Sequence, residues 1–167
     1  MKLFTNVLKE PALHYLLQEY EVKKSGNYWA VNEFFWNKKL LEGVEGITTS
    51  THVSESTYPV VLADLEGKLP DTKNVVLQYY NWHKGAGISP HGDESYRFGA
   101  TVYLNESWNP AWGGIFHWKD SFGEQKTFLP EFNSLVLNDE QEEHWVTNVS
   151  RKAPYCRKTL QIWGLFK

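Results

Sequence analysis

The sequence contains very little cysteine, and its basic residues do not cluster. Cys156 is the only cysteine among 167 residues, which excludes an intramolecular disulfide and a thiolate metal cluster within the chain. No basic run is longer than two residues and the net charge is −3, whereas nucleic-acid binding requires clustered Lys and Arg against the phosphates. The composition therefore predicts a disulfide-free protein that does not bind nucleic acid.

Long apolar runs are also absent. No stretch approaches the roughly 20 residues that cross a membrane, and residues 1–6 lack the apolar segment of a signal peptide. We therefore expect a cytoplasmic protein with no membrane partner. Aromatic residues, by contrast, are abundant, with eight Trp, nine Tyr and nine Phe. Because large rings bury much surface per residue, we expect most of them to stabilise the core of a small sheet protein.

The pattern of the sequence changes near residue 70 from helix-forming to strand-forming segments. Before it, apolar residues at helical spacing predict helices over 11–20, 31–41 and 58–69. After it, runs of β-forming residues predict strands at 75–80, 100–104, 134–137 and 159–163. We expect one domain spanning 1–167, in which a helical support layer (1–70) covers a β-barrel core (71–167).

The strongest chemical signal is the segment Pro90-His91-Gly92-Asp93. Two residues apart on a strand, His91 and Asp93 would point to the same face and reach one metal ion. A third ligand would come from a distant strand, where His144 is the candidate. Two His and one carboxylate leave open positions on an iron ion, as in non-haem Fe(II) oxygenases. Taken alone, the short His-x-Asp motif also fits a surface pair in a turn, so the hypothesis depends on the surrounding motifs.

Those motifs resemble the Fe(II)/2-oxoglutarate dioxygenases, in particular the prolyl-hydroxylase-like branch. The resemblance covers residues 75–166 and implies a mainly β fold with N-terminal helices around a double-stranded β-helix, a jelly-roll or cupin-like barrel. Residues 1–70 contain no matching motif. The similar segments follow the family's order: Tyr80 before His91-Gly92-Asp93, Arg97 before Thr101-Val102-Tyr103-Leu104-Asn105, Gly113-Gly114, Pro130 to Leu137, His144-Trp145-Val146 with Val149, and Arg157 to Trp163.

The resemblance implies that His91, Asp93 and His144 are the catalytic iron ligands. A carboxylate at position 93 argues against a halogenase, in which a small residue leaves room for halide. Arg157 would bind the distal carboxylate of 2-oxoglutarate, because a guanidinium matches a carboxylate with two hydrogen bonds. Arg151 is the rival for this role, since the gap from His144 to Arg157 is longer than usual in the family.

Three further residues are implied near the cosubstrate, namely Thr159, Tyr103 and Tyr80. Tyr79 is adjacent to Tyr80 on a predicted strand, so only one of the two can face the interior of the barrel. The family match favours Tyr80. For Tyr103 and Tyr80 the alternative is a packed core ring with a satisfied hydroxyl group.

Four residues are candidates for substrate contact. Trp163 either forms a wall of the substrate pocket or packs in the core. Trp108 and Trp112 lie on a predicted loop, where they would grip the substrate as a lid or cap the end of the barrel. Arg97, close to the metal motif, is the fourth candidate.

The implied enzyme uses Fe(II), 2-oxoglutarate and O₂, with ascorbate as an auxiliary reductant, to hydroxylate a peptide or a small molecule. The leading substrate class is a peptidyl (prolyl) residue or a free amino acid. One alternative is a small-metabolite oxygenase of the same superfamily. Another is a non-catalytic metal-binding β-barrel that serves as a scaffold or sensor.

Overall fold

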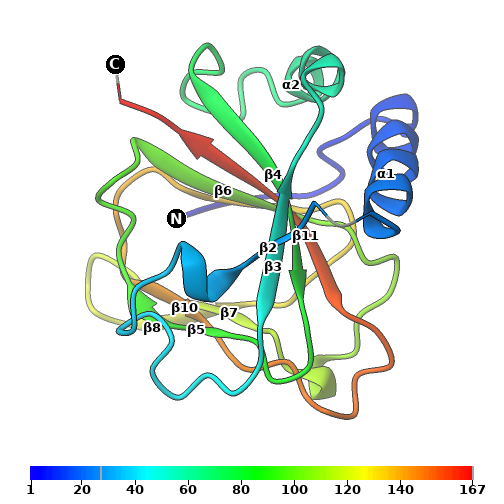
Figure 1. Cartoon of the computed structure of the whole chain (residues 1–167). Coiled ribbons are helices and arrows are strands. Elements are labelled where there is room, and N and C mark those ends of the chain that lie inside the picture. The colour runs from blue at the N-terminus through cyan, green and yellow to red at the C-terminus, as the bar shows by residue number, and fades with distance from the viewer. Residues whose placement is uncertain (27, 167) are drawn as a thin grey trace.

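The computed structural model describes residues 1–26 and 28–166, which form two antiparallel β-sheets with helices on one side (Figure 1). The larger sheet has seven strands in the order β1-β9-β6-β11-β4-β3-β2. In that order the strands are β1 (Lys2–Phe4), β9 (Leu135–Asn138), β6 (Phe98–Tyr103), β11 (Arg157–Gly164), β4 (Val75–Trp82), β3 (Thr48–His52) and β2 (Ala30–Val31). The four strands predicted from β-forming runs, at 75–80, 100–104, 134–137 and 159–163, correspond to β4, β6, β9 and β11.

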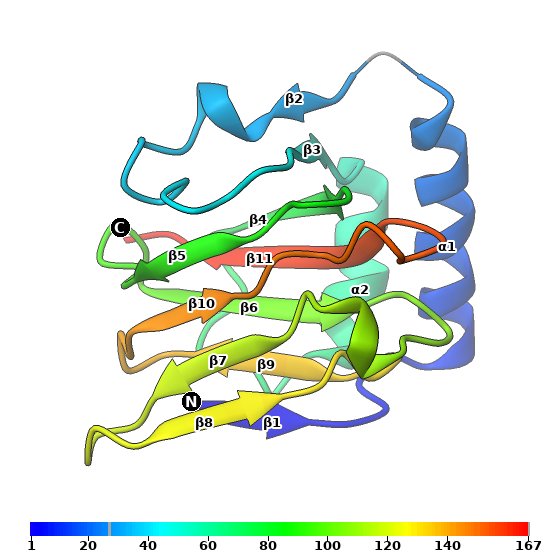
Figure 2. The same ribbon diagram turned by 90° about the horizontal axis from the view of Figure 1, so that it is seen from below.

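The smaller sheet has four strands in the order β5-β10-β7-β8, and Figure 2 shows it in front of the larger sheet. Its strands are β5 (Ile88–His91), β10 (His144–Val146), β7 (Phe116–Lys119) and β8 (Gln125–Phe128). Among the described residues, no strand pairing joins the two sheets, so the jelly roll is formed by two open sheets rather than a closed ring.

Two α-helices cover the face of the larger sheet that points away from the smaller one. Helix α1 (Glu10–Lys24) has Pro11 in its first turn, where the backbone N–H has no partner within the helix and its loss costs little. Lys23 and Lys24 lie in the last turn, where the helix dipole favours positive charge. Helix α2 (Tyr58–Asp64) follows a 3₁₀ turn, η2 (Glu55–Thr57). None of the helices in the described part of the chain is long and apolar enough to cross a membrane.

Strand alternation divides the larger sheet into two differently packed faces. On β4, Leu77 and Tyr79 pack toward the helices, whereas Tyr80 and Trp82 pack against residues of the smaller sheet. On β11, Leu160 and Ile162 belong to the helix side, so the alternate residue Arg157 faces the space between the sheets. This space holds the candidate site.

The helix predicted over residues 31–41 is wrong. The structure has the short strand β2, the 3₁₀ turn η1 (Asn32–Phe34) and a series of turns there. Trp36 and Leu40, which supplied the helical spacing, pack against the cluster between the sheets. The side chain of Asn37 accepts a hydrogen bond from the Leu40 N–H at 3.1 Å, which favours a turn over a continuing helix.

Two other expectations for the N-terminal part need adjustment. The predicted helix 58–69 ends at Asp64 and continues as turns. The segment 1–70 also contributes β1, β2 and β3 to the larger sheet, in addition to the helical layer. Strand β3 reads Thr-Thr-Ser-Thr-His, a polar run without the apolar alternation that identifies a strand.

The connection between β2 and β3 spans the gap between the two sheets. It is held to the smaller sheet by Ser89 of β5, whose N–H donates to Leu40 O at 3.0 Å and whose hydroxyl donates to Glu42 O at 2.6 Å. The Gly46 N–H donates to Gly85 O at 2.9 Å. The connection therefore covers one side of the space between the sheets.

Candidate active site

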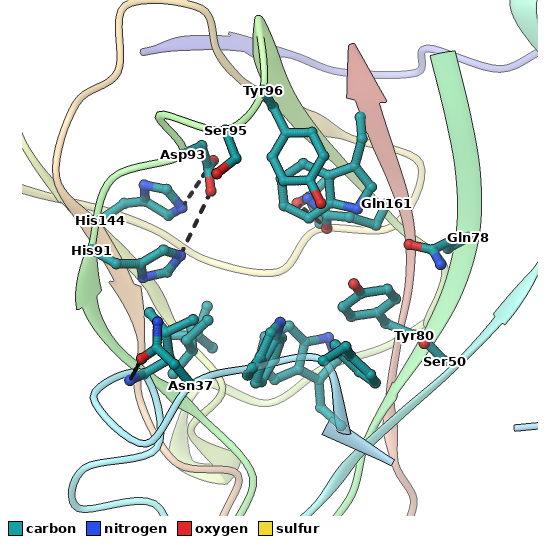
Figure 3. Close-up of a pocket in the computed structure, with 18 of the residues that line it drawn as sticks. Asn37, Ser50, Gln78, Tyr80, His91, Asp93, Ser95, Tyr96, His144 and Gln161 are labelled. Atoms are coloured by element: carbon teal, nitrogen blue, oxygen red, sulfur yellow. Dashed lines mark hydrogen bonds and ion pairs between the residues drawn. The ribbon is translucent and has the colours of Figure 1, made fainter. Parts of the chain in front are cut away.

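His91, Asp93 and His144 come together at one end of the smaller sheet. His91 is the last residue of β5 and His144 the first of β10, and the two are register partners across this strand pair. Asp93 lies two residues beyond the end of β5, so the prediction that it shares a strand with His91 is wrong. The turn after β5 nevertheless brings its carboxylate to both imidazoles (Figure 3).

The three side chains are close enough to share one ion. Asp93 Oδ1 is 3.8 Å from His91 Nε2, and Asp93 Oδ2 is 3.4 Å from His144 Nε2. One ligand atom from each residue lies within 4.8 Å of the other two. Ligand atoms about 2.1 Å from a common ion are separated by roughly 3–4 Å, so small side-chain adjustments suffice. The group has the composition that suits a non-haem iron site.

Backbone carbonyl groups orient both imidazoles. His91 Nδ1 lies 2.7 Å from Ser89 O, and His144 Nδ1 lies 3.0 Å from Glu142 O. A carbonyl oxygen only accepts, so these two contacts favour a proton on each Nδ1 and a free lone pair on each Nε2. At His144 the Asn138 amide nitrogen also lies 3.2 Å from Nδ1, farther than the Glu142 carbonyl oxygen. Both lone pairs belong to the nitrogen nearer to Asp93. This is the tautomer that a metal ligand requires, fixed by hydrogen bonds outside the ligand set.

Burial favours the uncharged forms of all three groups in the metal-free protein. It lowers the pKa of His144 to about 4 and, together with the adjacent His144, lowers the pKa of His91. It raises the pKa of Asp93 to about 6. Near neutral pH the imidazoles are neutral and the carboxylate is ionised, which are the protonation states that bind a divalent cation.

The space around Asp93 depends on a glycine in the facing sheet. A Cβ atom at Gly99 of β6 would lie 2.7 Å from Asp93 Oδ2 and 3.1 Å from the Trp163 ring. Glycine at position 99 therefore leaves the room that the Asp93 carboxylate occupies, because it has no side chain. Trp163 in turn stacks on Tyr96, with ring centroids 4.3 Å apart.

A cavity of about 790 Å³ opens in front of these residues, between the two sheets and the β2–β3 connection. Its walls are strongly aromatic, with Tyr80, Trp82, Phe116 and Trp163 from the strands and Phe35 and Trp36 from the connection. The volume suits a small organic molecule together with part of a substrate.

Arg157 lies at this cavity with its charge uncompensated. The side chain is 1% exposed, and its guanidinium carbon lies 5.0 Å from the Trp82 ring centroid and 4.9 Å from that of Tyr103. No carboxylate of the described residues forms an ion pair with it, and its Nε and Nη1 have no hydrogen-bond partner. The Tyr103 hydroxyl is also buried, beside the guanidinium, and has no other hydrogen-bond partner. Buried charges are normally paired, so this arrangement calls for an anion that the protein itself does not supply.

The family comparison agrees with this arrangement. The family model described as the 2OG-Fe(II) oxygenase superfamily matches residues 74–164, which is more than half of the chain. The chain belongs to this superfamily. A 2OG-Fe(II) oxygenase requires Fe(II), 2-oxoglutarate and O₂, so the protein is a 2-oxoglutarate-dependent iron dioxygenase. A search of curated protein sequences found no match to the chain.

Solved structures show the same fold in prolyl hydroxylases. A Pseudomonas putida prolyl-4-hydroxylase superimposes with a TM-score of 0.72 at 18% identity, over 99% of this chain and 92% of that one. A Trichoplax adhaerens prolyl hydroxylase, solved with a hypoxia inducible factor oxygen degradation domain peptide, gives 0.70 at 16% identity, over 97% and 81%. The viral collagen prolyl hydroxylase of Paramecium bursaria Chlorella virus-1, solved with 2OG, gives 0.63 at 12% identity, over 97% and 93%. Below 25% identity these matches establish the fold.

The remaining residues predicted near the cosubstrate are brought to the same region of the oxygenase. Tyr80 lines the cavity, whereas Tyr79 packs beneath α1 and donates from its hydroxyl to Leu16 O. Thr159 is buried beside Tyr80 and Tyr103 in register, and its hydroxyl accepts a hydrogen bond from Trp82 Nε1 at 3.1 Å. Arg151, the rival of Arg157, is exposed and pairs with Glu45.

Three of the four predicted substrate contacts are not brought to the cavity. Trp108 and Trp112 pack edge to face with each other, and both contact Tyr155. Trp108 Nε1 donates to Gly113 O at 2.8 Å. Arg97 is exposed and forms an ion pair with Asp71 at 3.0 Å. Each side chain has a local partner that holds it elsewhere. The fourth, Trp163, lines the cavity.

Sequence reasoning missed several residues that line the oxygenase cavity, namely Tyr96, Thr101, Gln78 and Gln161. Gln161 could have been found, because it lies between Thr159 and Trp163 on the same face of a predicted strand. Tyr96 follows the metal motif in a turn, and Gln78 precedes Tyr80 by two positions, but nothing in the sequence shows where either side chain points.

Proposed function

We propose that the protein hydroxylates an amino acid residue, with a peptidyl residue such as proline as the leading substrate class. In this proposal His91, Asp93 and His144 hold Fe(II), and Arg157 binds the distal carboxylate of 2-oxoglutarate. The overall conversion consumes 2-oxoglutarate, O₂ and a C–H group and yields succinate, CO₂ and the corresponding alcohol. The observation that carries the proposal is the unpaired, buried Arg157 in the same cavity as a three-residue ligand set.

The ligand set fits an iron ion by its chemistry. Two neutral imidazoles and one carboxylate bind Fe(II) and leave positions open for a cosubstrate and O₂. When bound, the iron would activate O₂ for the oxidation of the C–H bond, while the protein contributes positions and surroundings. The carbonyl groups of Ser89 and Glu142 keep the imidazole lone pairs directed at the ion.

Arg157 and its neighbours fit the cosubstrate. The Nε and Nη1 atoms of the guanidinium have no hydrogen-bond partner, and a carboxylate can accept from two N–H groups at once when it pairs with Nη2 together with either of these atoms. The Tyr103 hydroxyl, which is buried beside the guanidinium and has no other partner, can donate a third hydrogen bond. The rings of Trp82 and Tyr103 both contact the guanidinium, so it is positioned before the cosubstrate arrives. Gly114, whose Cβ would lie 2.7 Å from Arg157 Cδ, leaves room for the side chain.

The direct test is conversion of 2-oxoglutarate by the purified protein. With Fe(II) and O₂ we expect succinate to form, and we expect a peptide product heavier by one oxygen atom when a peptide substrate is present. Asp93→Ala should form no succinate. Conversion of a small metabolite in place of any peptide would support the alternative oxygenase, whereas metal binding without succinate formation would support a non-catalytic scaffold or sensor.

A further inference from the structure

Four polar side chains form a continuous row across the larger sheet. His52 of β3 is the register partner of Gln78 of β4, Gln78 is the partner of Gln161 of β11, and Gln161 is the partner of Thr101 of β6. Directly paired residues of antiparallel strands point to the same face, and all four line the cavity. We call His52, Gln78, Gln161 and Thr101 the polar row.

The polar row leads from solvent toward the metal ligands. His52 is exposed, Gln78 is half-buried and Gln161 is only 8% exposed. Thr101 lies two residues from Gly99, the glycine beneath the Asp93 carboxylate, on the same face of β6. Two residues of a strand span roughly 7 Å. In Figure 3 Gln78 and Gln161 lie across the cavity from His91, Asp93 and His144.

The two amide groups of the polar row have free hydrogen-bonding capacity. Gln161 Oε1 accepts from the Thr101 hydroxyl at 2.8 Å, which fixes the amide plane and leaves both hydrogens of Nε2 available. The Gln78 amide forms no hydrogen bond with any other residue in the described part of the chain. An amide in this setting can both donate to a carbonyl group and accept from an N–H group.

The few charged side chains around the polar row indicate that it binds an uncharged part of the substrate. Apart from Asp93 and Arg157, the Lys, Arg, Asp and Glu side chains that line the cavity are Lys39 and Glu94, and both are exposed. A free amino acid would have to place an ammonium and a carboxylate group against uncharged amides, and burying unpaired charges is costly. Peptide groups, which are neutral donors and acceptors, match glutamine amides directly.

The length of the row points to a chain rather than a single residue. Neighbouring strands lie about 4.8 Å apart, so four strands span roughly 14 Å. An extended polypeptide advances roughly 3.3 Å per residue, so the row matches about four residues of it. We propose that the polar row is the substrate track of this oxygenase. It binds peptide groups of an extended polypeptide, and Gln78 and Gln161 determine specificity for an amino acid within a chain over the free amino acid.

This inference rests on the proposed function, and its test separates the two. Wild-type protein with Fe(II), 2-oxoglutarate and O₂ is given two sets of probes. One set contains the twenty capped peptides Ac-Gly-Gly-X-Gly-Gly-NH₂, and the other contains the twenty free amino acids. We expect at least one capped peptide to gain one oxygen atom, with kcat/KM at least about tenfold above that of the free amino acid X. Such a ratio corresponds to the loss of one or two hydrogen bonds.

Two results would overturn the substrate track. One is hydroxylation of a free amino acid with a kcat/KM comparable to that of its capped peptide. The other is succinate formation without hydroxylation of any capped peptide. If no succinate forms under any condition, the proposed function itself is refuted, and this inference falls with it.

Variants then test the two glutamines. Gln161→Leu should raise the KM for the best peptide roughly tenfold, and Thr101→Val, which releases the Gln161 amide, should raise it less. Gln78→Leu should abolish the advantage of the five-residue peptide over the capped single residue Ac-X-NH₂. The matched control is Gln125→Leu, an exposed glutamine of β8 outside the cavity, which should leave both values unchanged.

Circular dichroism and thermal melting check that each variant folds. If the buried substitution Gln161→Leu fails to fold, the half-buried Gln78→Leu still decides, through the dependence of kcat/KM on peptide length. An unchanged length dependence in folded Gln78→Leu would contradict the substrate track.

Discussion

His144 lies directly opposite His91 across the β5–β10 strand pair, with ring centroids 4.3 Å apart. Both imidazoles therefore project from a paired backbone rather than from loops, and only Asp93 depends on the turn after β5. The distance between the imidazoles meets the condition on which the sequence-based hypothesis of a shared iron ion depended.

Removing the carboxylate of Asp93 should strongly weaken metal binding without unfolding the protein. We expect Asp93→Ala to bind Fe(II) or Co(II) at least about a hundredfold more weakly, since substitutions behind metal ligands already cost 10–100-fold. The thermal midpoint of the metal-free protein should not fall, because the variant no longer buries a carboxylate that is 7% exposed. Anaerobic titration and circular dichroism measure the two effects. His14→Ala, on the exposed face of α1, is the control and should bind metal normally.

Metal affinity should decrease at acidic pH. Burial raises the pKa of Asp93 to about 6 in the metal-free protein, so below that pH the incoming ion must displace a proton. We expect the apparent affinity to fall about tenfold per pH unit below pH 6 and to level off above about pH 7. His144, whose pKa burial lowers to about 4, should add to the loss only at lower pH. Mn(II) titrations between pH 5 and pH 8 would measure this fall in affinity. An affinity that does not change over that range would contradict the assignment of Asp93 as a metal ligand.

Substitution of Arg157 should affect the cosubstrate more than stability. We expect Arg157→Met to raise the KM for 2-oxoglutarate roughly a hundredfold or more, as truncating one partner of a buried charged pair does. The free energy of unfolding without cosubstrate should change by less than about 1 kcal/mol, because Met retains most of the packing and removes an unpaired buried cation. The KM of Arg157→Lys for 2-oxoglutarate should lie between those of the wild type and Arg157→Met, since lysine keeps the charge but loses the bidentate geometry.

The readouts for Arg157 are succinate formation and the rise in melting temperature on adding 2-oxoglutarate with Mn(II). This rise should disappear in Arg157→Met. Arg151→Met is the matched control, because that arginine is exposed and bound to Glu45 at 3.2 Å. A full thermal response in Arg157→Met would show that 2-oxoglutarate binds elsewhere.

Glu19 should stabilise the contact between α1 and the segment that leads into α2. Its carboxylate accepts from Ser54 N–H at 2.7 Å and from the Thr57 hydroxyl at 2.6 Å. Burial alone would raise the pKa of Glu19, but these hydrogen bonds hold it below the usual value. A depressed pKa in the folded state contributes stability above the unfolded pKa, near 4.5, and that contribution is lost as the pH falls through the folded value.

We therefore expect Glu19→Gln to lower the free energy of unfolding by about 1–3 kcal/mol at pH 7 and by much less at pH 3. Urea titrations at the two pH values measure the difference. Glu21→Gln serves as the control, because Glu21 lies on the same helix with 56% of its side chain exposed and should have little effect at either pH. Equal losses at both pH values would mean that Glu19 acts through packing and not through its charge.

The parts of the fold that the sequence predicts are those with strong local patterns. Strands β4 and β11 contain runs of β-branched and aromatic residues, and α1 has Pro11 at its start and a periodic apolar face. Strand β3 was not predicted because its residues are polar, and it is a strand because it pairs with β4. The helix expected over 31–41 failed because Trp36 and Leu40 face a cavity rather than a continuous core.

The candidate site shows the same division. His91, Asp93, His144 and Arg157 were found because they lie within short motifs in a recognisable order. The polar row could not be found, because the pairing of Gln78 with Gln161 depends on the register between two strands whose residues are far apart in the chain. Trp108 and Trp112 do not line the cavity, since an aromatic pair in a loop can be satisfied by local packing alone.

Gly99 gives position 99 diagnostic value among related sequences. Any larger residue there would meet the Asp93 carboxylate and the Trp163 ring at the same time. A homologue that keeps the His–Asp–His set but has a bulkier residue at this position must displace its carboxylate or rebuild the facing strand. Genome surveys that count ligands alone would score such a sequence as competent, whereas inspecting this glycine would set it apart.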